Sequence, residues 1–278
     1  MSFPVFKDLD KDVVDMIEDD FDSKFTLKIK SAGPCKSTIT TNVQFVDKDG
    51  KTSLKPKVSV KWPHPSGFTL DKLEFSPDCR MTVETSLTNA LPGLKFDFKG
   101  NDAEKADLSF KYNLQDMATI TGDFDINSLS RAETTITHGH GAFLAGVSAK
   151  FATAKDDSKT ATKMTLGAGL SHTVDNVCFT ALRAKDNFSN FSLLFSYTQM
   201  ANIDLAGSIN HCAAKTDATL ATAYKVDAST TFKAKATTEG VISASVKKAF
   251  EKKFAVTGSV EVPTSMKSIK WGLNATLG

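Results

Sequence analysis

The feature that most constrains the fold is an alternation of apolar and polar residues, which starts at Lys24 and continues to the C-terminus. In Phe25, Leu27 and Ile29, for example, every second side chain is apolar. A period of two is the period of a β-strand, because successive side chains of a strand point to opposite faces of the sheet. We count about nineteen such segments of about 8 to 11 residues, separated by turns rich in Gly, Asn, Asp, Pro or Lys. The chain is therefore predicted to form a long series of strands.

Alternation alone also fits a soluble β-sandwich with half-buried strands. Three features favour a barrel in lipid: the second face is consistently Thr, Ser, Asn, Lys and Gly, the connections are short, and the pattern continues without a domain linker. A soluble barrel of that size would have an unfilled interior. In lipid, the apolar face turns outward and the polar face lines a wet lumen. We therefore predict an all-β transmembrane β-barrel of about 19 strands.

The composition excludes a bundle of membrane-spanning helices. Charged residues make up 24% of the chain and the mean hydropathy is -0.18. There is no run of about 18 apolar residues, the length that a spanning helix needs. Strands remain as the spanning elements, since in lipid only helices and closed barrels satisfy all their backbone polar groups. The net charge of +2 is too small to indicate a nucleic acid as partner.

Residues 3–21 have a different pattern, in which Leu9, Val13 and Ile17 recur at helical spacing. This spacing predicts one amphipathic α-helix. Residues 7–22 hold two lysines and eight acidic residues, a net charge of −6, so the rest of the chain carries +8. Such a run of charge is most often a solvated face. It also suits a helix that lies against the wall of a basic pore.

The N-terminus lacks the charged region and apolar stretch of a secretory signal. Bacterial outer-membrane barrels are exported with such a signal, so we expect a barrel of mitochondria or plastids. The four cysteines are widely spaced and are predicted to be free thiols. We expect two parts, an N-terminal helical segment over residues 1–23 and the transmembrane barrel over residues 24–278.

Several motifs along the chain resemble those of one family. They are Phe6-Lys7-Asp8-Leu9, residues 67–72, Gly93-Leu94-Lys95, and residues 122–126, 143–146 and 151–155. The chain resembles the eukaryotic porins, the voltage-dependent anion channels of the mitochondrial outer membrane, over nearly its whole length. The resemblance implies a nineteen-stranded barrel with the helix inside or at the pore. It also implies passive passage of ATP, ADP, phosphate and small organic anions.

A basic lumen would concentrate anions and leave them hydrated. The predicted pore-lining residues are lysines between apolar neighbours in the alternating segments: Lys28, Lys30, Lys57, Lys61, Lys95, Lys111, Lys233, Lys235 and Lys270. An alternative for those near strand ends is that they reach lipid headgroups. We expect the charged helix to act in voltage gating, and the candidate gating residues are Leu9, Lys11, Asp12, Val13, Asp15 and Ile17.

Three further predictions follow from the resemblance. Gly93, Leu94 and Lys95 would contact a nucleotide. Lys270, Gly272, Ala275 and Leu277 would form the signal that the mitochondrial barrel-sorting machinery reads. Asp71 would be a carboxylate facing lipid, whereas the alternation places it in the lumen or in a bulge, which we favour.

The chain departs from the family in two places. Its helix is more acidic, and the glycine-rich hinge that should follow the helix is replaced by Asp20-Phe21-Asp22-Ser23-Lys24. A helix of net −6 would offset much of the lumen's positive charge. The sequence therefore leaves the ion preference open, together with the resting position of the helix.

No motif indicates catalysis, a cofactor or a metal. His138 and His140 fit a strand connection better than a metal site. We predict a channel and not an enzyme, with the lipid bilayer, permeant nucleotides and small anions, and the sorting machinery as partners. Whether copies form a homo-oligomer stays open. The alternatives are a protein-import pore of the same barrel superfamily and a soluble β-rich binding protein.

Overall fold

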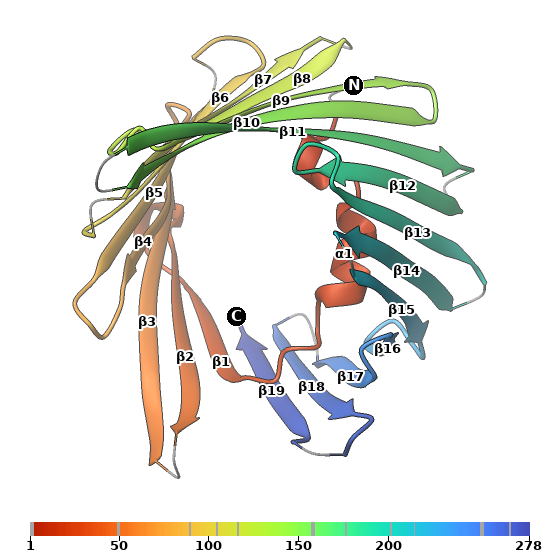
Figure 1. Ribbon diagram of the computed structural model, residues 1–278. Helices are drawn as coiled ribbons and strands as arrows, with labels where there is room; N and C mark the ends of the chain where they lie inside the picture. The colour runs from red at the N-terminus through yellow and green to blue at the C-terminus, as the bar shows by residue number, and fades with distance from the viewer. Residues whose placement is uncertain are drawn as a thin grey trace.

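The computed structural model describes residues 3–48, 51–88, 90–103, 105–115, 117–156, 159–175, 177–200, 202–213, 215–250, 253–266 and 268–278. These residues form a nineteen-stranded sheet that closes into a barrel, with the N-terminal helix on the inside of the wall (Figure 1). The helices are η1 (Phe6–Asp8), α1 (Lys11–Glu18) and η2 (Pro34–Lys36). The strands are β1 (Phe25–Ala32), β2 (Thr38–Lys48), β3 (Lys51–Pro63), β4 (Phe68–Phe75), β5 (Met81–Thr88), β6 (Leu94–Asn101), β7 (Ala106–Leu114), β8 (Ala118–Asp125), β9 (Arg131–His140), β10 (Phe143–Asp156), β11 (Lys159–Val174), β12 (Cys178–Lys185), β13 (Asn190–Met200), β14 (Ile203–Cys212), β15 (Lys215–Lys225), β16 (Thr230–Thr237), β17 (Val241–Phe250), β18 (Phe254–Pro263) and β19 (Lys270–Leu277).

The barrel closes by pairing its first strand with its last. Consecutive strands are antiparallel, and an odd number of alternating strands leaves β1 and β19 pointing the same way. Their pairing is accordingly parallel, with Phe25 opposite Leu273 and Ile29 opposite Leu277. Closure removes the unpaired edges that an open sheet would present. The predicted fold class is thus confirmed.

The register divides each strand between an outer and an inner face. Phe25 lies opposite Phe45 of β2 and Leu273 of β19, so these apolar side chains share the outer face. Lys28 follows the other phase of the alternation and lies opposite Asn42. Large apolar residues stay exposed on the outside, whereas a buried apolar cluster lies in the lumen under α1. An apolar exterior with a polar interior is the arrangement of a membrane barrel. In the described part of the chain, no helix has the length and apolar character needed to cross a membrane.

The helical region is shorter than predicted and is broken. A single helix was expected over residues 3–21, but η1 ends at Asp8 and α1 begins at Lys11. Asp10 between them has φ −125° and ψ 14°, outside the helical region. Its carboxylate pairs with Arg183 of the wall, so the chain turns at Asp10 and follows the curved wall instead of continuing straight.

Three strands are longer than the alternation predicted: β3 has 13 residues, β10 has 14 and β11 has 16. The two longest are β10 and β11. They pair with each other as far as Asp156 and Lys159, but β9 pairs with β10 only to Ala152 and β12 with β11 only from Ala168. The far end of this hairpin therefore extends beyond its neighbours. The predicted length of about 8 to 11 residues was wrong here, because two strands can continue to pair without a third.

Asp71 lies in a β-bulge. The register between β3 and β4 shifts between Val60 and Trp62, and that between β4 and β5 shifts between Leu70 and Lys72. Asp71 is the extra residue, and its carboxylate is 3.2 Å from Nζ of Lys61, which has an inner-face position. The extra residue changes the phase of the strand, and this explains why the alternation blurs there.

Candidate functional site

The N-terminal segment, residues 3–22, runs along the inner wall and meets successive strands in order. It begins where the carbonyl of Phe3 accepts a hydrogen bond from Thr119 of β8 at 2.8 Å. η1 lies against β10, α1 packs on β13, β14 and β15, and the carbonyl of Asp22 accepts a hydrogen bond from β18 (Figure 1). We call β10 to β18 the covered arc. Among the described residues, β1 to β7, the bare arc, make no hydrogen bond or ion pair with the segment.

An apolar seam joins α1 to the covered arc. Val13 and Ile17 have exposed fractions of 1% and 8%, and they lie in one cluster with Ala206 and Ala221 of the wall. Full burial of such side chains contributes about 1.5–3 kcal/mol each. Three of the four buried wall residues of the cluster are alanines and the fourth is Leu194, so the helix can lie close to the strands. The seam holds the helix on the wall and out of the middle of the lumen.

Two wall glycines let η1 approach just as closely. A Cβ atom at Gly146 of β10 would lie 2.6 Å from Cδ2 of Phe6. At Gly169 of β11 it would lie 3.2 Å from Cε2 of the same ring. Neither position needs glycine for its backbone angles, so the requirement is one of space. Phe6 is 6% exposed in this slot.

Arg183 of β12 anchors the break in the segment. Its guanidinium is 2.8 Å from the carboxylate of Asp10, and the two side chains are 9% and 6% exposed. It also donates a hydrogen bond to the carbonyl of Phe6 and lies over the Phe6 ring, 5.3 Å from the centroid. Burial raises the pKa of Asp10 above its ordinary value, and the charge of Arg183 only partly opposes this rise. A buried pair of this kind is sensitive to the loss of either partner.

Asp20 forms a second anchor beyond the end of α1. Its carboxylate is 3.0 Å from Nζ of Lys233 on β16 and 3.1 Å from Nζ of Lys247 on β17. Burial would raise the pKa of Asp20, but hydrogen bonds from the two lysines outweigh it and hold the pKa below its ordinary value. Asp20 also has φ +73°, which fits a point where the chain leaves the helix and turns toward β1.

Lysines of β16 also satisfy carbonyls at the C-terminal end of α1. Nζ of Lys235 donates to the carbonyl of Ile17 and Nζ of Lys233 to that of Asp19, each at 3.3 Å. Positive groups are favourable here because the last carbonyls of a helix lack partners within it. Lys235 Nζ also lies 4.4 Å from the ring centroid of Phe21. Two of the predicted pore-lining lysines thus hold the segment.

The opposite side of the segment faces the lumen and is acidic. Of the candidate gating residues, Leu9, Val13 and Ile17 are buried on the wall, whereas Lys11 and Asp12 are exposed and Asp15 is half-buried. Other exposed charges of the segment are Lys7, Asp8, Glu18, Asp19 and Asp22. Acidic groups outnumber basic ones on this surface. A solute in the lumen meets negative charge on the segment.

The remaining predicted lysines have inner-face positions in the register. Four of them pair with a carboxylate: Lys57 with Glu74 at 3.1 Å, Lys61 with Asp71 at 3.2 Å, Lys95 with Asp97 at 2.7 Å and Lys270 with Glu261 at 3.0 Å. Within the described ranges, Lys28, Lys30 and Lys111 have no ion pair. The lysines are spread around the barrel and do not converge on one point.

The structure does not bring Gly93, Leu94 and Lys95 together as one surface. Gly93 lies in the connection from β5 to β6 with φ +80°, a conformation that favours glycine. Leu94 lies opposite Tyr112 on the outer face, whereas Lys95 lies on the inner face. The glycine therefore has a structural reason for its position.

The predicted sorting residues all lie on β19. Lys270 and Gly272 have inner-face positions, and Ala275 and Leu277 lie on the outer face, where Leu277 is opposite Phe254. A Cβ atom at Gly272 would lie 2.1 Å from the carbonyl oxygen of Asp22. The N-terminal segment passes directly over this position, so Gly272 is required by the folded barrel.

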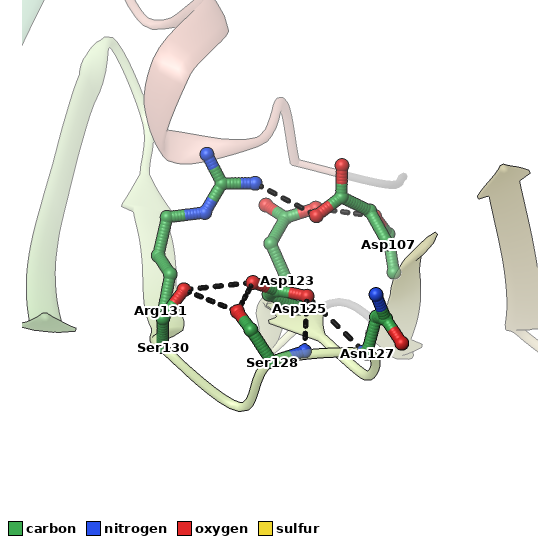
Figure 2. Close-up of polar contacts among 8 residues, drawn as sticks. Asp107, Asp123, Asp125, Asn127, Ser128, Ser130 and Arg131 are labelled. Carbon is green, nitrogen blue, oxygen red and sulfur yellow. Dashed lines mark hydrogen bonds and ion pairs between the residues drawn. The ribbon is translucent and has the colours of Figure 1, made fainter. Parts of the chain in front are cut away.

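A polar cluster lies at the end of β8 (Figure 2). Asp125 accepts hydrogen bonds from the backbone amides of Asn127 at 3.1 Å and Ser128 at 3.2 Å, and from Oγ of Ser130 at 2.7 Å. These bonds fix the connection to β9, as Asp commonly does in turns. Next to it, Arg131 reaches across to Asp107 at 3.0 Å. The cluster is explained by turn structure.

Sequence reasoning missed the residues that anchor the segment. Arg183, Lys247 and Ser259 contact it from the wall, and Asp10 and Asp20 bind from its own side. Arg183 is one of three arginines in the chain and stands between Leu182 and Ala184 in an alternating strand. That position could have marked it as a lumen residue.

Known proteins fit this architecture. The family model for eukaryotic porins matches residues 3–272. A mitochondrial outer membrane protein, porin 1 of Arabidopsis thaliana, is 23% identical over 212 residues, which cover 74% of this chain and 75% of that protein.

Among solved structures, a mutant of the Rh. blastica porin has a TM-score of 0.49 at 12% identity and covers 91% of this chain and 95% of that one. A loop-deletion mutant of OmpT, an outer membrane protein of Vibrio cholerae, has a TM-score of 0.42 at 11% identity and covers 91% and 96%. Both similarities are too weak to indicate a shared function.

The family match covers almost the entire chain, and the barrel has an apolar exterior and a charged lumen. Together they point to a pore in an outer membrane and not to an enzyme. The chain belongs to the eukaryotic porin family.

Proposed function

We propose that this pore is a voltage-gated channel of the mitochondrial outer membrane, which lets small hydrophilic metabolites and ions diffuse through. The observation that carries the proposal is the docked position of the N-terminal segment: it lies flat on the covered arc and is held at Asp10 and Asp20 by wall cations. Solutes can pass through the lumen only if the segment lies at its wall. A gate needs an element that can change its position.

Voltage acts on the charges of the segment. Moving one elementary charge across 100 mV is worth about 2.3 kcal/mol. Residues 7–22 carry a net charge of −6, so movement through only part of the field would supply enough energy to compete with the anchors. In this proposal the docked segment is the open state, and release of the segment from the wall lowers the conductance.

The permeants we propose are ATP, ADP, phosphate and organic anions. A lumen wall rich in lysine attracts anions by its potential and leaves them hydrated. The lysines predicted to line the pore have inner-face positions, which supports this role, and Lys28 and Lys30 of the bare arc have free charges among the described residues. The acidic surface of the segment reduces the preference for anions. In the Gly93-Leu94-Lys95 motif, Lys95 is the residue that can reach a passing nucleotide.

Planar-bilayer recording across a salt gradient tests the function. Purified, refolded protein should give large conductance steps, and the conductance should fall at high voltage. The sign of the reversal potential should be that of a channel that prefers anions. Cation preference would assign the selectivity to the segment instead of the wall. Absence of conductance from folded protein would contradict the proposal.

The exposed acidic side of the segment favours one second candidate, a protein-import pore. Asp8, Asp12, Glu18 and Asp19 are exposed to the lumen and could attract a basic presequence. A presequence peptide added to the bilayer should then block the conductance at low concentration, and a scrambled peptide of equal charge should not. If both peptides block the conductance equally, the block is explained by charge attraction alone, and the import pore is excluded.

Placement in the mitochondrial outer membrane rests on the Arabidopsis relative and on the C-terminal strand. We propose that Lys270, Gly272, Ala275 and Leu277 serve the sorting machinery as well as the fold. Import of radiolabelled protein into isolated mitochondria, followed by carbonate extraction, tests this. A Leu277→Ser variant should stay extractable by carbonate. The control for a general loss of apolar surface is Leu273→Ser, which changes another residue on the same outer face of β19.

A further inference from the structure

A hollow of about 250 Å³ lies between the N-terminal segment and the wall. Phe6 and Lys7 line it from the segment, and Lys150 of β10, Gly167 of β11 and Lys185 of β12 line it from the wall. A Cβ atom at Gly167 would lie 2.7 Å from Oγ of Ser148, so the glycine keeps the floor of the hollow free of a side chain. A second hollow of about 320 Å³ under α1 shares Lys7 and Lys185 with it.

Basic side chains outnumber carboxylates in the lining of this hollow. Lys7, Lys150 and Lys185 take part in no ion pair among the described residues, unlike the anchoring lysines of β16 and β17. Two carboxylates also line the hollow: Glu133 lies opposite Lys150 in the register of β9 and β10, and Asp186 already accepts a hydrogen bond from Asn190. Three like charges near one another repel, and an anion between them relieves that repulsion.

Arg183 is a fourth basic side chain in the lining of the hollow. Its side chain is 9% exposed and lines the same hollow. The terminal nitrogen binds Asp10 and the carbonyl of Phe6, but the buried Nε has no hydrogen-bond partner in the described part of the chain. A buried donor without a partner is unfavourable. The charge of Arg183 adds to the positive lining of the hollow.

We propose that this hollow is a binding site for a compact polyanion that carries two or more phosphate or carboxylate groups. Its volume is below the range of about 300–1,000 Å³ that is usual for drug-sized ligands, so the ligand is small. The ligand bridges Lys7 of the segment and Lys150 and Lys185 of the wall. Because it binds the docked segment only, a concentration of a hundred times its Kd raises the docking equilibrium constant about a hundredfold.

Isothermal titration of the refolded 278-residue protein in detergent micelles with pyrophosphate, at constant ionic strength, tests the site. We expect one saturable site, and a Kd about tenfold weaker in each of Lys150→Gln and Lys185→Gln. Lys55→Gln is the matched control, since Lys55 has an inner-face position on β3 and no ion pair in the described ranges. Equal weakening by Lys55→Gln would overturn the proposal, since binding would then be general attraction to a basic lumen.

A second readout follows the segment itself. Pyrophosphate should slow hydrogen exchange of the α1 amides in the wild type and leave it unchanged in Lys185→Gln. Citrate, titrated in the same way, decides whether carboxylates serve as well as phosphates. If neither anion binds or protects α1, the proposal is wrong. Both measurements work without ion flow, so their failure is distinct from a failure of the proposed channel function.

Discussion

The covered arc and the bare arc are built from the same alternating strands but differ in what faces the lumen. Under the segment, inner positions are small, as at Gly146, Ala206 and Ala221, and they are buried. On the bare arc, inner positions are long and charged and pair with one another, as Glu74 does with Lys57 of the neighbouring strand at 3.1 Å and with Lys72 of its own strand at 2.8 Å.

The difference follows from what each surface touches. A lumen wall that faces water can satisfy long polar side chains with solvent and with cross-strand partners. A wall covered by a helix must instead offer small residues for close packing and a few buried partners for the charges of the helix. Small apolar residues on the inner face of a barrel therefore indicate that another part of the chain covers them.

Removal of Arg183 should break the covered arc with the largest effect. Arg183→Met leaves the carboxylate of Asp10 buried without its partner, which costs about 3–5 kcal/mol. We expect the α1 amides to lose their protection in hydrogen exchange while the strands keep theirs. Arg131→Met is the control, because its ion pair with Asp107 has side chains 47% and 33% exposed and contributes at most about 1 kcal/mol. Unchanged protection in Arg183→Met would show that the apolar seam alone holds the segment.

A bulky residue under α1 should have the next largest effect. Ala206 has an exposed fraction of 0%, and Ala206→Phe would overpack the seam at a cost of about 1–3 kcal/mol. We expect faster exchange of α1 and a less stable open state in bilayer recordings. Thr40→Phe places the same ring on the inner face of the bare arc, where it should leave α1 unaffected. Equal exchange in the two variants would mean that the seam is not tightly packed.

The two anchors should respond to pH with opposite sign. Docking raises the pKa of Asp10, so docking grows more stable as pH falls through that raised pKa. Docking lowers the pKa of Asp20, so its contribution is present above the ordinary value of 3.8 and is lost as pH falls below it. Once the intrinsic pH dependence of amide exchange is divided out, exchange of α1 between pH 7 and pH 3 should therefore first slow and then accelerate.

Variants assign the two limbs of this pH profile. Asp10→Asn should remove the slowing and Asp20→Asn the acceleration, and Asp12→Asn, at an exposed position of the helix, should change neither. A profile that keeps both limbs in Asp10→Asn and Asp20→Asn would assign the pH dependence to other groups.

The barrel could be predicted from the sequence because the outer face of a membrane barrel must be apolar along every strand. This requirement produces an alternation of apolar and polar residues with a period of two. The sequence also predicted the apolar stripe of Leu9, Val13 and Ile17, which is buried on the wall. It did not predict the break at Asp10, because the break depends on Arg183, far away in the chain. The lengths of β3, β10 and β11 were missed for the same reason, since they are set by pairing with neighbouring strands, whereas the bulge at Asp71 was among the favoured alternatives because the alternation blurs there.

The alternation also carried a signal that was not used. β12 has Phe179, Ala181 and Arg183 on its inner face, so both faces of this strand contain apolar residues and the period is weak. A weak two-residue alternation makes a strand hard to predict. In β12 the alternation is weak because side chains on both faces are buried. Local patterning thus predicts which strands exist, whereas the place of the segment depends on contacts between residues distant in sequence.

The smallest effect is expected at the ion pairs of the bare arc. Lys57 and Glu74 have side chains 49% and 16% exposed, so a double-mutant cycle with Lys57→Met and Glu74→Gln should give a coupling energy of about 0.2–1 kcal/mol for unfolding in denaturant. The same cycle with Lys233→Met and Asp20→Asn, whose side chains are 16% and 15% exposed, should give a larger coupling energy for docking of α1, because less water competes for the pair. If the coupling energy of Lys57 and Glu74 equals or exceeds that of Lys233 and Asp20, exposure to the lumen does not determine the strength of these pairs. The difference between the arcs would then lie in the apolar seam alone.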